Sequence, residues 1–82
     1  MRESVDLLLT SEGVPSGLRR AGSDYEVIDT PTPLEVGVPF VTHPPPSLSG
    51  WRFTGRSGDE VRVFDVVRTP SGSGWWLFRD YE

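Results

Sequence analysis

Residues 50–82 read GWRFTGRSGDEVRVFDVVRTPSGSGWWLFRDYE, and this stretch decides the fold. It contains all three tryptophans of the chain and four valines between residues 61 and 67. β-Branched and aromatic side chains favour strands, whereas the glycine-containing segments at 56–59 and 70–74 favour turns. We therefore expect three antiparallel strands joined by two turns.

The register between the last two strands decides which side chains face the core, because a one-residue slip moves every side chain to the other face. One register pairs Asp65 with Arg79, and the other pairs Val66 with Leu77. We favour the first register, because it neutralises a charge pair and places an arginine, Arg68, beside the Trp76 ring.

Both faces of this hairpin carry large apolar groups, which is unusual for a sheet with one face in water. The last strand splits into a set that we assign to the core, namely Trp75, Leu77 and Tyr81, and an outer pair, Trp76 and Phe78. Two explanations remain open for the outer pair. Either the preceding proline-rich connector covers it, or it forms a docking patch.

The first 29 residues also read as strands and turns. Apolar and β-branched runs separated by Gly, Pro, Ser and Asp predict a strand at 5–10, a short edge strand at 18–20 and a strand at 25–29. In the third of these, Tyr25 and Val27 share one face and Glu26 points outward. No window shows helical periodicity free of Pro or Gly, so no long helix is expected.

Residues 30–49 are rich in proline and read as a connector. This connector is expected to be loop-like, with a few strand-like residues within 36–42, such as those at 40–42. Residues 43–46, His-Pro-Pro-Pro, favour polyproline II. That segment is either a ligand for a proline-recognising module or, as we favour, a stiff connector laid over the barrel. The whole chain, residues 1–82, is expected to form one all-β domain. We expect an SH3-like or partly open barrel of about five to six antiparallel strands.

Composition excludes several kinds of site. The 82 residues include no cysteine, so a disulfide framework and a thiolate metal site are both excluded. The single histidine, His43, is too little for a zinc site, and no cofactor is expected. No apolar run reaches the roughly 20 residues of a membrane helix, and no signal-peptide pattern opens the chain. We expect a cytoplasmic protein.

The charge argues against unaided nucleic-acid binding. The net charge is −4, all eight basic residues are arginine, and residues 1–49 hold three arginines against seven acids. Affinity for a duplex comes largely from neutralising phosphates, which an acidic chain does poorly.

The sequence contains no recognisable set of catalytic residues. His43 precedes three prolines and has no nucleophile elbow to serve. The glycine-rich segments lack the following helix of a phosphate loop. Asp59 and Glu60 are neighbours on a strand, so their carboxylates point to opposite faces. We expect no enzymatic activity.

The end of the chain resembles the C-terminal signature of a family of small actinobacterial proteins of unknown function. That family ends in aromatic-x-Leu-x-Arg-x-Tyr-acidic, which is met here by Trp75, Leu77, Arg79, Tyr81 and Glu82. The same module also forms a C-terminal tail on some Y-family DNA-polymerase-like proteins. Upstream, the family's strand, Gly/Pro turn, basic segment, Gly turn and Tyr-x-Val correspond to 7–10, 13–15, 18–20, Gly22 and 25–27.

The chain departs from that family in two places. Its basic segment at 18–21 carries no aromatic residue, and a proline-rich stretch at 30–49 replaces the usual tryptophan-containing one. The resemblance implies a small β module associated with DNA repair or translesion synthesis that acts through protein contacts.

Three hypotheses for function follow. The first is a non-catalytic protein-interaction module that docks through Trp76 and Phe78, with Arg52 or Arg68 at the rim. The second is a module that contacts single-stranded nucleic acid through phosphate-binding arginines, namely Arg19, Arg20, Arg52, Arg56 and Arg68, and a stacking tryptophan. The third is a self-associating structural subunit, such as a phage or shell component, that uses the same aromatic face.

Overall fold

The computed structural model describes residues 3–37, 47–69, 72 and 74–81, and it confirms an all-β fold. These residues form strands, turns and short connections, with no helix among them. The seven strands are β1 (Glu3–Leu9), β2 (Pro15–Arg20), β3 (Ser23–Val27), β4 (Thr32–Gly37), β5 (Ser47–Ser57), β6 (Glu60–Arg68) and β7 (Trp75–Tyr81).

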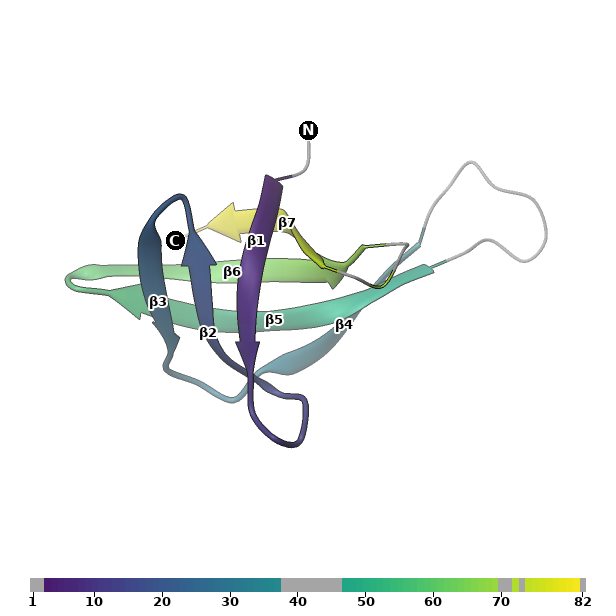
Figure 1. Cartoon of the computed structure of the whole chain (residues 1–82), viewed down its shortest axis with the longest axis horizontal. Coiled ribbons are helices and arrows are strands. Elements are labelled where there is room, and N and C mark those ends of the chain that lie inside the picture. Colours follow the sequence, from purple (N-terminus) through teal and green to yellow (C-terminus); the bar gives the residue numbers. More distant parts are fainter. Residues whose placement is uncertain (1–2, 38–46, 70–71, 73, 82) are drawn as a thin grey trace.

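Six of these strands close into a small antiparallel barrel. The sheet order is β3-β2-β1-β7-β6-β5-β4, and a further pairing between β3 and β5 closes the ring without β4. The barrel is therefore closed rather than partly open, with β4 as an additional strand. In Figure 1, β5 and β6 run side by side as two long strands, and β1, β2 and β3 lie across them.

One edge of β5 is divided between two partners. β3 pairs with Gly55 and Arg56, whereas β4 pairs with residues 47–52. A strand of 11 residues is long enough for both. As a consequence, β4 follows β5 away from β3, toward one end of the barrel (Figure 1).

The core lies between the two crossing layers. Its centre is Phe64, whose ring makes an edge contact with Tyr25 at 4.9 Å between centroids and lies 5.9 Å from Phe53. The remaining buried members of the cluster are Val5, Leu18, Val66 and Leu77. The predicted face of the 25–29 strand is confirmed at Tyr25, which is buried, and at Glu26, which is exposed.

A β-bulge in β7 combines the two registers that the sequence allowed. Asp65 lies opposite Arg79, as expected, but the register then shifts and Val66 lies opposite Leu77. Phe78 is the extra residue of the bulge, because it has no partner in the ladder. Each register is thus correct for one half of the hairpin.

The bulge exchanges the faces of the residues that follow it. Asp80 lies opposite the core residue Phe64, and Tyr81 lies opposite Val63, on the outer face. The assignment of Tyr81 to the core set with Trp75 and Leu77 was therefore wrong. An extra residue reverses the alternation of side chains along the rest of the strand.

Two other expectations are corrected by the sheet. The segment at 18–20 is not an edge strand, because β2 pairs with β1 on one side and with β3 on the other. The connector is not wholly loop-like, because β4 lies within it. Pro33 is tolerated there since β4 pairs with a single neighbour, β5, among the described strands. The strand-like residues at 40–42 and the polyproline segment at 43–46 lie outside the described residues.

Gly50 lies opposite Val67 of β6, where the β6 backbone leaves no room for a side chain. A Cβ atom at this position would overlap the carbonyl oxygen of Val66. The Gly50→Ala variant should therefore lose at least about 3 kcal/mol of the roughly 4–12 kcal/mol expected for a chain of this size. Gly74→Ala is the matched control, because its Cβ would meet Thr69 at an ordinary 3.8 Å. Urea denaturation measures both, and equal stabilities would contradict the close approach.

Candidate functional site

The core face of the sheet continues past the end of the barrel. Trp51 is two residues from the core residue Phe53, so both side chains share a face. Trp51 lies opposite Pro33 of β4, and Arg68 lies opposite Trp75 of β7. Because Arg68 is two residues from the core residue Val66, it shares the same face. The two tryptophans thus extend the apolar core outward.

This extended face forms a cleft of about 450 Å³. Its floor is made by the half-buried side chains of Trp51 and Trp75, both of which pack against the core. β4 contributes one wall through Pro33 and Glu35, and Gly13 in the turn between β1 and β2 lines the cleft as well. The cleft therefore lies between the β1–β2 turn and β4, which is outside the closed ring of six strands.

The cleft contains two charged groups, of which Arg68 is already engaged by neighbouring groups and Glu35, within the described part of the chain, is not. The Arg68 guanidinium lies 4.6 Å above the Trp75 ring and donates a hydrogen bond to the carbonyl oxygen of Gly72 at 3.0 Å. Arg68 was expected beside Trp76, and the shift of register moves it to Trp75. The Glu35 carboxylate is exposed and has no ion-pair or hydrogen-bond partner among the described residues. The cleft thus combines an apolar floor, a held cation and an available carboxylate.

The two outer aromatics lie outside this cleft. Phe78 is 37% exposed at the bulge, with the Arg79 guanidinium 5.9 Å from its ring centre. Trp76 is half-buried and lies opposite Val67, which is fully buried on the outer side of the sheet. Of the four residues that the sequence suggested, the structure brings only Arg68 to the cleft.

Arg52 has a structural partner. Its Nε and Nη2 atoms donate to both carboxylate oxygens of Asp65 at 2.7 and 3.0 Å. Asp65 is only 2% exposed, and this bidentate contact raises the pKa of the Arg52 guanidinium. The expected pairing of Asp65 with Arg79 was therefore wrong at the level of side chains, although the two residues are opposite each other in the ladder.

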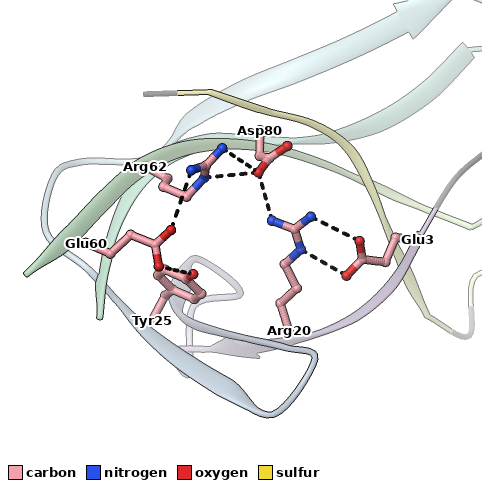
Figure 2. A network of polar contacts seen from close by, with 6 residues as sticks. All are labelled: Glu3, Arg20, Tyr25, Glu60, Arg62 and Asp80. Atoms are coloured by element: carbon pink, nitrogen blue, oxygen red, sulfur yellow. Dashed lines mark hydrogen bonds and ion pairs between the residues drawn. The ribbon is translucent and has the colours of Figure 1, made fainter. Parts of the chain in front are cut away.

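A polar network lies at the other end of β6, away from the cleft. Arg20 donates two hydrogen bonds to Glu3, at 2.9 and 3.1 Å, and one to Asp80 at 2.8 Å. Figure 2 shows Asp80 between Arg20 and Arg62, whose Nε also donates to it at 3.0 Å. These contacts join β1, β2, β6 and β7.

The same network reaches β3 through a tyrosine. The Tyr25 hydroxyl donates to Glu60 at 2.9 Å, and Arg62 lies 3.5 Å from the other Glu60 oxygen (Figure 2). Burial, followed by this hydrogen bond, raises the pKa of Tyr25. Every charged group in the network has a partner of opposite charge. We therefore interpret the network as a structural one that stabilises this end of the barrel. Sequence reasoning missed it, because it depends on the bulge that turns Asp80 inward.

The arginines proposed for phosphate contacts are mostly engaged by carboxylates. Arg19 pairs with Asp24 at 2.8 Å, and Arg56 approaches Glu26 at 4.0 Å. Arg20 and Arg52 have the partners described above, and Arg68 stacks on a tryptophan. This arrangement weakens the nucleic-acid hypothesis, since a phosphate would have to compete with an existing partner for four of the five side chains.

Comparison with known proteins adds no relative. No family model matches the chain, and no curated protein and no solved structure matches it either. The resemblance of the C-terminal strand to the actinobacterial family therefore stays a prediction. Within the described part of the chain, no three His, Cys, Asp or Glu residues lie close enough to hold a metal ion. The same residues form no helix that could cross a membrane.

The network predicts a pH dependence of stability. Hydrogen bonding to Arg20, together with the positive charges, holds the pKa of Asp80 below its ordinary value of 3.8. A depressed carboxyl pKa stabilises the fold at pH values above the unfolded pKa, and this contribution is lost as the pH falls through the folded pKa. Asp80→Asn should therefore cost about 1–2 kcal/mol at pH 7, and the difference from the wild type should shrink below about pH 4.

Urea denaturation from pH 7 to pH 2 measures this effect. Asp24→Asn is the matched control. Both side chains of the Arg19–Asp24 pair are exposed, so the pair should contribute little to the free energy of unfolding. A difference between the wild type and Asp80→Asn that persists unchanged at pH 2 would contradict the role assigned to Asp80.

Proposed function

We propose that this chain is a non-catalytic protein-interaction module that binds a segment of another protein in the cleft above Trp51 and Trp75. The observation that carries the proposal is the concave apolar floor made by two tryptophans at the open end of a closed barrel. Aromatic side chains and arginine dominate the energetics of protein interfaces, and the cleft presents both.

The polar groups of the cleft fit binding better than catalysis. Among the described lining residues, the charged side chains are Glu35 on β4 and Arg68 on β6. Arg68 is already stacked and hydrogen-bonded. Ser49 lies opposite Glu35 and also lines the cleft, but the described lining residues include no histidine that would activate its hydroxyl as in a hydrolase triad. These groups are suited to orienting a bound chain.

The cleft is a better docking site than the outer aromatics. Trp76 is half-buried and lies opposite the buried Val67 in the ladder, so part of its surface is already covered within the fold. Phe78 projects singly from a bulge, and single exposed apolar side chains are common on protein surfaces. The cleft instead combines two aromatic rings with flanking polar groups, as small binding sites do.

The cellular setting forms part of the same proposal. The resemblance of residues 75–82 to the tail of Y-family DNA-polymerase-like proteins supports a role in DNA repair or translesion synthesis, in the cytoplasm. Self-association would use the same apolar surfaces, and it is an outcome of the experiments below.

Selection from a random dodecamer peptide library on the immobilised chain tests the function. We expect enriched peptides that bind with micromolar Kd by fluorescence anisotropy. Ser49 is exposed and lines the cleft, so Ser49→Tyr should fill the site and weaken binding at least tenfold. Phe78→Ser, on the outer surface, is the matched control and should change the Kd less than about twofold.

Each alternative result has a defined meaning. If the selection enriches no peptide at all, the proposed function is wrong. Loss of binding in Phe78→Ser with full binding in Ser49→Tyr would move the site to the outer aromatics and overturn the assignment to the cleft. Circular dichroism of both variants verifies that they are folded.

A further inference from the structure

The backbone of β5 shows which of its residues face β4. The Ile28 N–H donates to the Thr54 carbonyl oxygen at 3.0 Å, and the Thr54 N–H donates to the Asp29 carboxylate at 2.9 Å. Thr54 therefore turns its backbone groups toward the edge that β3 and β4 share. Backbone groups alternate in direction along a strand, so Arg52 and Gly50 turn theirs to the same edge.

This direction fixes the orientation of β4. Thr32 lies opposite Arg52, and Leu34 lies opposite Gly50, so these residues exchange hydrogen bonds with β5. Pro33 and Glu35 alternate with them and turn their backbone groups away from β5. The position of Pro33 agrees with this assignment, because a proline has no N–H to donate and is tolerated on the free side of an edge strand.

β4 therefore has a free hydrogen-bonding edge at Glu35. In the described part of the chain β4 pairs with β5 alone, and no other backbone bond to Glu35 occurs there. The cleft lies beside this edge, since Pro33 and Glu35 form one of its walls and Gly13 of the β1–β2 turn lines it too. An unpaired edge next to an apolar cleft is a site for strand addition.

We propose that the occupant of the cleft is an extended peptide segment of a partner protein, which adds to β4 as a further strand. Its backbone pairs with the N–H and C=O of Glu35 and lies in the cleft between β4 and the β1–β2 turn. The inference rests on the proposed function and gives it a binding mode.

The surroundings define the chemistry of this segment. Alternate side chains of an added strand point to the same face, so one set covers Trp51 and Trp75 and should be apolar. A basic side chain beside β4 would pair with the free Glu35 carboxylate. An acidic side chain on the opposite side would meet Arg68. The segment needs free backbone N–H groups, which distinguishes it from a proline-rich ligand.

Two substitutions of Glu35 separate its charge from its backbone. Glu35→Gln removes the charge and should weaken a selected basic peptide about two- to fivefold, as expected for an exposed ion pair. Glu35→Pro also removes the N–H, which faces away from β5, and should weaken binding at least tenfold. Urea denaturation of the free variants tests whether the pairing of β4 with β5 survives the proline.

N-Methylation of the selected peptide tests the same contact from the other side. A series of peptides carries one methyl group each, moved stepwise along the backbone nitrogens. Methylation should abolish binding at every second position, because only every second N–H of an added strand faces β4. This measurement requires no change in the protein, so it holds even if Glu35→Pro fails to fold. Anisotropy with each methylated peptide gives the pattern.

The outcomes distinguish the binding mode from the function. Selected peptides that contain central prolines and tolerate N-methylation would overturn strand addition while leaving the proposed function intact. Enrichment of no peptide would remove the function itself. Concentration-dependent dimers that Glu35→Pro abolishes, without any selected peptide, would identify a second copy of the chain as the occupant and overturn the assignment to a partner protein.

Discussion

The division of one β5 edge between β3 and β4 is the constraint on which the rest of the structure depends. β3 pairs with β5 at residues 55 and 56 and closes the barrel, so β4 is left with residues 47–52 beyond the point of closure. As β4 has no second neighbour among the described strands, its outer edge is unpaired where it extends beyond the closed ring. Trp51 and Trp75 line the cleft beside this edge and are only half-buried.

The bulge at Phe78 explains why one end of the barrel is apolar and the other is charged. Before the bulge, Trp75 and Leu77 face the core, and Trp75 extends its apolar surface into the cleft. After it, the alternation is reversed, so Asp80 faces inward and binds Arg20 and Arg62. One inserted residue thus allows the same strand to supply an aromatic ring to the cleft at one end and a carboxylate to the ion-pair network at the other.

The sequence predicted the fold class where the local pattern and the tertiary fold agree. Trp51 and Phe53 alternate with polar residues, and Phe53 is buried as that pattern indicates. The bulge could not be located, because the Asp65–Arg79 and Val66–Leu77 registers are each favourable over their own half of the hairpin. The strand at β4 was missed because Pro33 argues against pairing unless a free edge is known.

The candidate site was harder to predict than the fold. Glu35, Trp51 and Trp75 come from three strands, and no local pattern links them. Arg68 was selected for its aromatic neighbour, but the register shift changed that neighbour from Trp76 to Trp75. Trp76 and Phe78 were selected because they were surplus to a one-faced sheet. That reasoning identified outward side chains without identifying a concave surface.

Residue-specific amide hydrogen exchange of the free chain by NMR tests the central claim most directly. If β4 has one paired and one free side, the Leu34 amide exchanges slowly, because it donates to β5, and the Glu35 amide exchanges rapidly. Addition of a bound peptide should then slow exchange at Glu35. Slow exchange at Glu35 in the free chain would show that this edge is already paired, and it would contradict both the free edge of β4 and strand addition.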